Sequence, residues 1–383
     1  DSLPGWVVAS VLLQYLDWVP WLITMSFVFS HINDVTTILL TVLLKWTLVG
    51  RVRPGSKREE GMWSRLWHWI VMVRLDYDTF TRYMYFFVNT EVLRLVWTCL
   101  GASIGRRVCM DAFTCHTPDL LTVGDKVIFG SKVTIICEDE GRRMPVQICR
   151  LANVLDNCTL MPGTVVGQQA ILGTKTVSST SQYFPPSTIN VGNKDGMATL
   201  LRKKGESPAD VAKREDEALQ RLESPCVWWS FNLGIIIWGL LVPVVPQVIS
   251  DAPFILAYLF MDSWWLVVAV FFAATLSMEL VGPLLIFVMK WCCIGKFKEK
   301  EISFFSFDHF KWCLWMGLNH PLQPLKKFRG TPLNSVFLRT LGAKVGRDAS
   351  LFGFGIEFDL LEIGECAHIG IDCDYACHTV MGS

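Results

Sequence analysis

The chain has 383 residues, of which 51% are hydrophobic, 12% aromatic and only 18% charged, and its formal net charge is zero. The neutral balance gives no support for binding nucleic acid. An apolar composition with positive mean hydropathy is unusual for a water-soluble protein of this length and predicts membrane-spanning segments.

Residues 1–50 are predicted to form a first transmembrane hairpin. Its apolar runs are Trp6–Ser30 and the shorter Val35–Val49, near the ~20 residues that a bilayer requires. The turn between them, His31–Asp34, contains no lysine or arginine, whereas basic residues follow the hairpin at Arg51, Arg53, Lys57 and Arg58. The positive-inside rule therefore places the far end in the cytoplasm.

Residues 51–99 are rich in large aromatic side chains and predict helices in the membrane interface, where amphipathic aromatics prefer to lie. The aromatic residues are Trp63, Trp67, Trp69, Tyr77, Phe80, Tyr83 and Phe86. Residues 295–340 repeat this character with Phe304, Phe305, Phe307, Phe310, Trp312 and Trp315. An aromatic pocket for a substrate remains an alternative interpretation.

Residues 100–200 carry an apolar residue at every sixth position, a period that neither a helix nor an ordinary strand has. These positions are Val123, Phe129 and Ile135, and after an irregular break Ile148, Val154, Leu160, Val166 and Leu172. Four residues after the apolar position comes a small or β-branched residue, as at Val127, Val133, Ala152, Cys158, Thr164 and Ala170. This hexapeptide repeat predicts a parallel β-helix, a three-sided prism whose coils stack at about 4.8 Å.

Residues 201–227 are predicted to be a solvated linker, because Arg202–Ser224 mixes basic and acidic side chains with few apolar ones. Residues 228–294 then predict a second hairpin from Trp228–Ile249 and Trp264–Met289. Its turn, Ser250–Ser263, again lacks basic residues, and lysines follow it at 290, 296, 298 and 300. By the positive-inside rule both prisms are cytoplasmic, where the thirteen cysteines are expected to be reduced thiols.

Residues 341–383 begin a second copy of the prism. Leu100–Arg106 matches Leu341–Arg347, and Asp119–Gly124 matches Asp359–Gly364. The six-residue spacing continues to Ser383, so this copy is predicted to be truncated and the chain, which starts with Asp1, to be a fragment. A third copy is expected beyond Ser383, because tandem prisms could reproduce the trimer in which such prisms usually assemble.

The run Met161–Gly167, followed by Ala170–Gly173 and Pro185–Pro186, resembles the closing coils of hexapeptide-repeat acyltransferases. The larger arrangement, with Thr331–Asn334 leading through Leu338–Arg339 into Leu341–Ala343, resembles the terminal region of membrane-embedded non-ribosomal peptide synthetases of the ε-poly-lysine type. The fold that follows is a mixed one, with tandem left-handed parallel β-helices alternating with transmembrane α-helical hairpins. The left-handed sense comes from this resemblance alone.

The resemblance implies a membrane-bound enzyme that forms acyl or peptide bonds. The donor would be a thioester of phosphopantetheine or CoA, with no cofactor bound directly, and the acceptor would be an amine. Adenylation and carrier domains would precede Asp1, and the partners would be those domains and membrane lipids. The tripeptide Asp1-Ser2-Leu3 matches the carrier attachment motif, but a predicted membrane span begins at Trp6, so we interpret the match as chance.

Hexapeptide acyltransferases generally use a histidine as the general base, just before a loop that interrupts the coils. In the first prism Glu138 stands at that place, and in the second His378 does, which makes His378 the first candidate. The first prism would then bind or scaffold and the second would catalyse. His116 is the next candidate, and Asp119 and Asp359 are candidate substrate-binding residues. Each of these has a plainer interpretation, as a solvent-facing histidine or a turn-capping aspartate.

A zinc site is not expected, although Cys366, His368, Cys373, Cys377 and His378 are all possible ligands. Residues share one side and height of a prism only at spacings near 18, and these residues do not. Two alternatives to the synthetase remain: a membrane-bound acetyl- or acyltransferase acting on a lipid or sugar, and a non-catalytic scaffold or export component. Charged residues in the predicted spans, Asp17, Lys45 and Glu279, keep the export component open. Lys45 can reach the basic end of its helix and Asp17 lies near Pro20, which leaves Glu279 as the residue that supports it.

Overall fold

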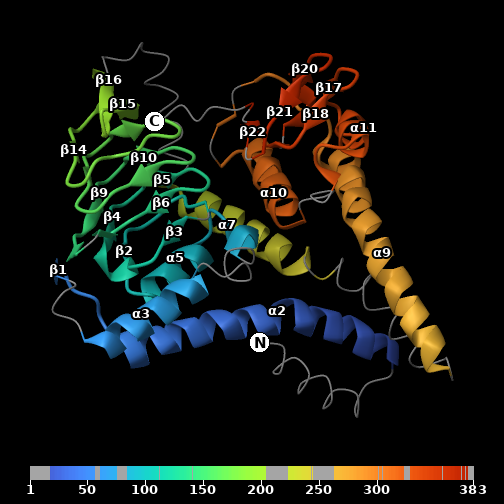
Figure 1. Ribbon diagram of the computed structural model, residues 1–383, viewed down its shortest axis with the longest axis horizontal. Helices are drawn as coiled ribbons and strands as arrows, with labels where there is room; N and C mark the ends of the chain where they lie inside the picture. The colour runs from blue at the N-terminus through green and yellow to red at the C-terminus, as the bar shows by residue number, and fades with distance from the viewer. Residues whose placement is uncertain are drawn as a thin grey trace. The chain divides into compact units, whose positions relative to one another are not determined.

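A computed structural model describes residues 18–56, 61–75, 84–111, 113–139, 141–203, 223–242, 244, 263–300, 302–303, 305–322, 328–355, 357–371, 373–375 and 377 (Figure 1). The chain divides into two compact units. One, which we call the first-prism unit, contains residues 34–236 with 381–383. The other, the second-prism unit, contains residues 1–33 and 237–380.

The first-prism unit begins with helices. Helix α2 (Trp18–Leu44), whose residues from 34 onward belong to this unit, continues into a π-helical turn, η1 (Lys45–Val49), and is followed by α3 (Met62–Leu75), the 3-10 turn η3 (Tyr85–Phe87) and α5 (Glu91–Cys99). Helix α5 buries Leu93 and Trp97, which are four residues apart and therefore lie on one face. The Trp97 ring stacks on Phe113, with 4.4 Å between the ring centroids. This contact joins α5 to the base of the prism.

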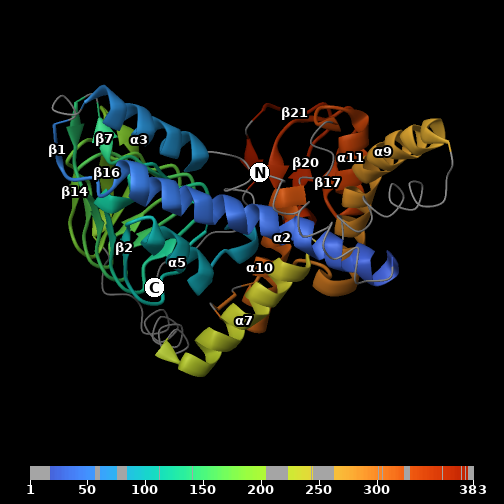
Figure 2. The ribbon, with the colours of Figure 1, turned by 90° about the horizontal axis from the view of Figure 1, so that it is seen from below.

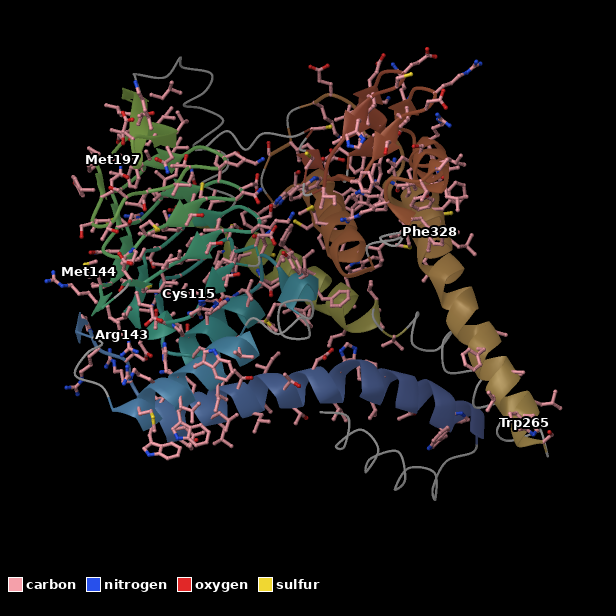
Figure 3. The ribbon with its side chains drawn as sticks, viewed as in Figure 1. Cys115, Arg143, Met144, Met197, Trp265 and Phe328 are labelled. Atoms are coloured by element: carbon pink, nitrogen blue, oxygen red, sulfur yellow. The ribbon has the colours of Figure 1, made fainter. Side chains whose placement is uncertain are left out.

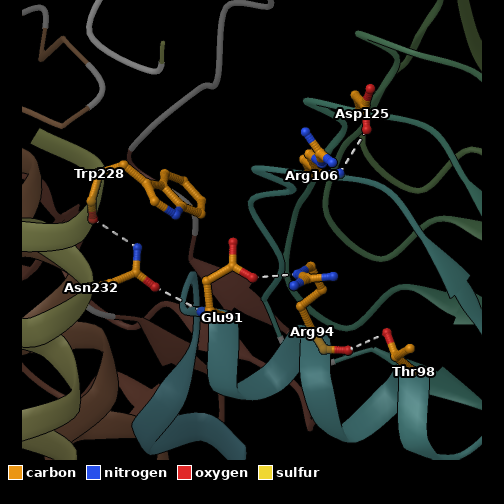
Figure 4. A network of polar contacts seen from close by, with 7 residues as sticks. All are labelled: Glu91, Arg94, Thr98, Arg106, Asp125, Trp228 and Asn232. Atoms are coloured by element: carbon orange, nitrogen blue, oxygen red, sulfur yellow. Dashed lines mark hydrogen bonds and ion pairs between the residues drawn. The ribbon is translucent and has the colours of Figure 1, made fainter. Parts of the chain in front are cut away.

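A buried amide connects α5 to α7 (Pro225–Leu241), as Figure 4 shows. The Asn232 side chain is fully buried. Its Oδ1 accepts a hydrogen bond of 2.7 Å from the Glu91 backbone nitrogen, and its Nδ2 donates one of 2.9 Å to the Trp228 carbonyl oxygen. The Glu91 nitrogen lies in the first turn of α5, where backbone N–H groups have no hydrogen-bond acceptor within their own helix. Asn232 therefore satisfies the start of α5.

The prism consists of short strands on three sides. The first side has the order β14-β12-β9-β4-β2, the second β16-β15-β13-β10-β5 and the third β11-β6-β3. The bounds are β2 (Ser103–Ile104), β3 (Thr114–Cys115), β4 (Leu121–Val123), β5 (Ile128–Phe129), β6 (Thr134–Ile135), β9 (Val146–Ile148), β10 (Asn153–Val154), β11 (Thr159–Leu160), β12 (Val165–Val166), β13 (Ile171–Leu172), β14 (Tyr183–Phe184), β15 (Thr188–Lys194) and β16 (Met197–Lys203). A 3-10 turn, η4 (Pro118–Leu120), precedes β4.

All neighbouring strands of the prism are parallel except β15 and β16. The apolar residue of each six-residue unit points inward, and Ile148, Val154, Leu160 and Leu172 are at most 1% exposed. The small positions, such as Ala152 and Ala170, are fully buried as well. The core is therefore a stack of large and small side chains in alternation, which a six-residue period produces when three units make one coil.

The predicted linker 201–227 begins later than expected, since residues 201–203 belong to β16. This strand pairs antiparallel with β15. It therefore covers backbone groups at the edge of β15 that would otherwise be unpaired. Residues 204–222 lie outside the described residues.

The second-prism unit repeats this order. It contains α9 (Trp264–Met289), a second π-helical turn η5 (Lys290–Ile294), α10 (Phe307–Leu322), α11 (Pro332–Thr340) and the 3-10 turn η7 (Phe358–Leu360). Its strands are β17 (Lys344–Val345), β18 (Ser350–Leu351), β19 (Phe354–Gly355), β20 (Glu362–Ile363), β21 (His368–Ile369) and β22 (Asp374–Tyr375). They form three parallel pairs, β17 with β20, β18 with β21 and β19 with β22.

The predicted transmembrane hairpins are wrong. The expected turn His31–Asp34 lies inside α2, because it contains no glycine or proline that would end a helix. The ring of His31 is buried there, with its Nε2 2.6 Å from the Leu240 carbonyl oxygen. Helix α7 covers Pro225–Leu241, and most of the rest of the expected span lies outside the described residues. The expected turn Ser250–Ser263 lies outside the described residues except for Ser263.

Within the described ranges, no helix is both long enough and apolar enough to cross a membrane. This finding overturns the prediction of a multi-pass membrane protein. The cytoplasmic orientation of the prisms was inferred from the hairpins and loses its basis with them.

Candidate active site in the first prism

The regular coils of the first prism are interrupted once between Ile135 and Ile148, where a β-hairpin projects. Strands β7 (Glu138–Asp139) and β8 (Arg142–Arg143) are antiparallel, and Glu138 pairs with Arg143. Strand β1 (Gly55–Ser56) adds to the other edge of β8. Figure 2 shows α3 beside β1 and β7, so a helix from the segment before the prism covers this interruption.

Three ionisable side chains meet at the hairpin. The Glu138 carboxylate accepts a hydrogen bond of 3.1 Å from Arg143 Nε, and His68 Nε2 lies 3.7 Å from the same carboxylate oxygen. The side chains of His68, Glu138 and Arg143 are only 7%, 10% and 5% exposed. We call them the His68 cluster. Figure 3 marks Arg143 near the hairpin.

The chemistry of the His68 cluster follows from its charges. The guanidinium keeps a buried carboxylate paired, and His68 Nε2 lies near the same carboxylate oxygen. His68 Nε2 is buried and makes no hydrogen bond within the described residues. A histidine near a carboxylate is one element of a general-base site, and here the two groups lie 3.7 Å apart without a hydrogen bond.

Two buried thiols lie next to the His68 cluster, and their pKa values shift in opposite directions: the hydrogen bond with the Cys115 thiol lowers the pKa of Cys137. Cys137 precedes Glu138, and Cys115 lies on the adjacent coil at β3 (Figure 3). Hydrogen bonding with the Cys137 thiol and burial raise the pKa of Cys115, and burial raises the pKa of Cys109 and of Cys158 to about 12. Thiols with raised pKa values stay protonated and pack as small apolar side chains. No disulfide links any of the described cysteines.

The other candidates from the sequence lie elsewhere. His116 is half-buried just after β3, between the buried residues Cys115 and Thr117. His378 lies outside the described residues, so its role as general base stays a prediction. No group of three histidine, cysteine or acidic residues in the described ranges has an arrangement that could hold a metal ion.

Asp119 lies in a buried ion pair. Its Oδ1 is 2.7 Å from Lys45 Nζ, the two side chains are 1% and 3% exposed, and its Oδ2 accepts a hydrogen bond from the Val52 backbone nitrogen. Gly101 has a positive φ of 112°, and a Cβ there would collide with the Asp119 carboxylate. The carboxylate therefore joins the end of η1 to the base of the prism.

Asp359 forms the same contacts in the second-prism unit. Its Oδ2 is 2.5 Å from Lys290 Nζ and accepts a hydrogen bond of 2.8 Å from the Phe297 backbone nitrogen. Gly342, with φ of 107°, is placed against it as Gly101 is against Asp119. Because both carboxylates are engaged with lysines and backbone in the same way, their observed role is structural. Substrate binding by Asp119 or Asp359 stays a prediction.

The second-prism unit has no His68 cluster among its described residues. Lys45 and Lys290 occupy corresponding positions in the two copies. With the same offset, Trp67-His68 corresponds to Trp312-Cys313. Trp312 Nε1 donates a hydrogen bond of 2.9 Å to Glu357, whose side chain is buried. The nearby His309 has Nε2 3.6 Å from Cys313 Sγ. Burial lowers the pKa of His309 to about 4, so this histidine is neutral at pH 7.

Sequence reasoning found Glu138 but missed His68 and Arg143. His68 is distant in sequence and sits among tryptophans, where it was interpreted as part of an interfacial helix. The internal repeat offered one signal for His68. The tryptophan before it, Trp67, aligns with Trp312, which marks a helix position common to both copies.

No protein-family profile matches the chain, and no curated protein sequence is similar to it. Solved structures of hexapeptide acetyltransferases are similar to part of it. One from Vibrio cholerae, complexed with acetyl coenzyme A, is 15% identical, with a TM-score of 0.27, and the match covers 35% of this chain and 86% of that one.

A maltose O-acetyltransferase from Clostridium difficile is 17% identical, with a TM-score of 0.27 and coverage of 42% and 97%. The serine acetyltransferase of Neisseria gonorrhoeae is 13% identical, with a TM-score of 0.25 and coverage of 50% and 74%. None of these scores is high enough to support an inference about activity, which we therefore argue from the residues of this chain.

Proposed function

We propose that the first prism is an acyltransferase in which His68 is the general base. The observation that carries the proposal is the His68 cluster, a buried histidine beside a paired carboxylate at the interruption of the coils. A structural ion pair needs only Glu138 and Arg143. The additional imidazole faces the carboxylate through Nε2, 3.7 Å away, so Nδ1 would be the nitrogen that takes a proton from the substrate.

In the proposed reaction an amine attacks the carbonyl carbon of an acyl thioester. His68 takes the proton that the amine loses as the new C–N bond forms, and Glu138 stabilises the resulting imidazolium. The C–S bond then breaks, and His68 returns the proton to the departing sulfur, so that the products are an amide and a free thiol. Backbone N–H groups of the prism would stabilise the oxyanion.

We further propose that the donor is a thioester of CoA or of a carrier-bound phosphopantetheine. The acetyl coenzyme A in the Vibrio cholerae structure belongs to that protein, and the carrier-bound form rests on the sequence resemblance to peptide synthetases. Under this proposal the chain is the terminal part of a synthetase.

The test is release of free thiol and formation of amide by the full chain, supplied with acetyl-CoA or an aminoacyl-pantetheine thioester and an amine. We expect H68Q to lower the rate by about 10²- to 10⁴-fold, the range for loss of a general base. The matched control is H368Q, because His368 is exposed on β21. H116A and H378A, measured in parallel, test the other candidate bases. A normal rate in H68Q with loss in either of these would move the catalytic role to that residue.

A non-catalytic scaffold is the second candidate, and one observation favours it. Glu138 and Asp119 are both engaged in buried ion pairs, so neither of these two candidate carboxylates of the first prism is uncommitted. Wild-type protein that folds but turns over neither thioester would support the scaffold and overturn the enzyme.

A further inference from the structure

Near the end of α2 and in η1, several polar side chains are buried while leucines are exposed. Thr37, Thr41 and Lys45 are buried, at most 2% exposed, whereas Leu39 and Leu43 point outward. The buried groups have partners: Thr41 Oγ1 donates to the Thr37 carbonyl oxygen and Lys45 pairs with Asp119. A helix in water normally buries its apolar side chains. The exposure of Leu39 and Leu43 therefore indicates that something other than water contacts this face.

The second-prism unit exposes apolar side chains at the same positions. At the spacing that separates Lys45 from Lys290, Leu39, Leu43, Trp46 and Met62 correspond to Leu284, Val288, Trp291 and Phe307. All eight side chains are between 43% and 70% exposed. We call the first four the first apolar stripe and the other four the second. The residue identities have changed at two of the four positions, but their apolar character and exposure have not.

The tryptophan of each stripe is held in place. Trp46 Nε1 donates a hydrogen bond of 2.6 Å to the Cys99 carbonyl oxygen, and Trp291 Nε1 donates one of 3.0 Å to the Thr340 carbonyl oxygen. The polar atom of each indole is thus satisfied within the protein, while much of the ring faces outward. An exposed apolar surface with polar residues at its border marks an interaction site.

Each stripe is followed by two exposed cations in corresponding positions. Arg51 and Arg53 follow Trp46, and Lys296 and Lys298 follow Trp291. Helix α3, which begins at Met62, contains no acidic residue. Near the second stripe, Asp308 is paired with Lys300 at 2.7 Å, and Glu299 is flanked by lysines in the sequence. Tryptophan and aliphatic side chains bordered by cations are suited to an anionic lipid surface, which presents acyl chains below negatively charged headgroups.

We propose that each apolar stripe lies against an anionic lipid surface, without crossing it. The apolar side chains enter the boundary between headgroups and acyl chains. The two cations that follow each tryptophan contact the headgroups. This inference does not depend on the acyl-transfer reaction.

The test is flotation of the full chain with vesicles of phosphatidylcholine alone or of phosphatidylcholine and phosphatidylserine in a 7:3 ratio. We expect the wild type to float with the anionic vesicles and less with the neutral ones, and added salt to weaken binding. The variant L43E/V288E should lower the partition coefficient at least tenfold, because each charge must enter the lipid boundary. The variant R51Q/R53Q/K296Q/K298Q should lose about tenfold or more on anionic vesicles alone, at roughly 1 kcal/mol per cation.

The matched control is L201E/L333E, since Leu201 and Leu333 are exposed leucines outside both stripes, and it should float as the wild type does. Circular dichroism establishes that each variant is folded. Wild type that stays unbound to anionic vesicles, or L43E/V288E that floats normally, would overturn the proposal. So would a change in sedimentation coefficient in L43E/V288E without a change in flotation, which would assign the stripes to contacts between copies of the chain.

Discussion

The buried pairs Lys45–Asp119 and Lys290–Asp359 show how single residues hold each prism to its helices. Burial lowers the pKa of Lys45, and the hydrogen bond to Asp119 opposes this effect. Each carboxylate also accepts a backbone N–H. Two charges withdrawn from water stabilise a fold little in themselves, but removing one of them leaves the other uncompensated.

We therefore predict that K45M lowers the free energy of unfolding by about 3–5 kcal/mol. The double variant K45M/D119L should recover much of that loss, because no buried charge remains alone. Urea unfolding followed by circular dichroism measures both. The control is K344M, which breaks the pair with Glu362, where both side chains are 74% exposed, and should have little effect. Equal losses in K45M and K344M would contradict the structural role of the buried pair.

His309 predicts a pH dependence of stability. Its pKa is lowered by burial to about 4 in the folded protein, from an ordinary value of 6.5. Between these values the unfolded chain binds more protons than the folded one, so stability rises with pH. His309 should therefore cost the fold up to about 1.4 kcal/mol per pH unit as pH falls from 6.5 towards 4. Unfolding of wild type and H309Q at several pH values tests this, and parallel curves would contradict it.

At the scale of elements, the strands of the first prism could be predicted from the sequence because the six-residue period states directly which side chains point inward. Val123, Phe129 and Ile135 on one side of the break, and Ile148 and Val154 on the other, are buried as that period requires. The helices were less predictable. An apolar run does not reveal what surrounds it, and the turn expected at His31–Asp34 had no residue that ends a helix.

The candidate site shows the same division. Glu138 could be placed from the sequence because it precedes the break in the period. His68 and Arg143 could not, since their approach to Glu138 depends on how α3 packs against the β7–β8 hairpin, a tertiary contact without a local signal. The pairing of Lys45 with Asp119 is of the same kind: the shared aspartate was visible in the repeat, but its lysine partner was interpreted as part of a membrane span.

The inward positions of the coils predict a clear mutational contrast. Leu160 is fully buried, so L160A should lower the free energy of unfolding by about 2–5 kcal/mol, through the cavity that it leaves. L201A removes the same atoms from an exposed position on β16 and should change stability by less than about 0.5 kcal/mol. Urea unfolding of the two variants provides the comparison, and similar losses would show that Leu160 does not fill the core.

At the scale of the whole molecule, the chain repeats one plan in two units, and the described residues differ between the units at a position that bears on chemistry. Both units join a π-helical turn to a parallel β-helix through a buried lysine–aspartate pair, and both expose an apolar stripe. His68, however, corresponds to Cys313. Within the described residues, the first prism therefore has a candidate acid–base group for which the second has no equivalent.

The central claim is that His68 and Glu138 act together to transfer an acyl group. Its most direct test is a double-mutant cycle on the rate of amide formation by the full chain, with wild type, H68Q, E138Q and H68Q/E138Q. When two residues act as one unit, the effects of their mutations on the activation free energy do not add. We predict that H68Q is slower by about 10²- to 10⁴-fold and that H68Q/E138Q is no slower than H68Q. A wild-type rate in H68Q, or losses that add in the double variant, would contradict the claim.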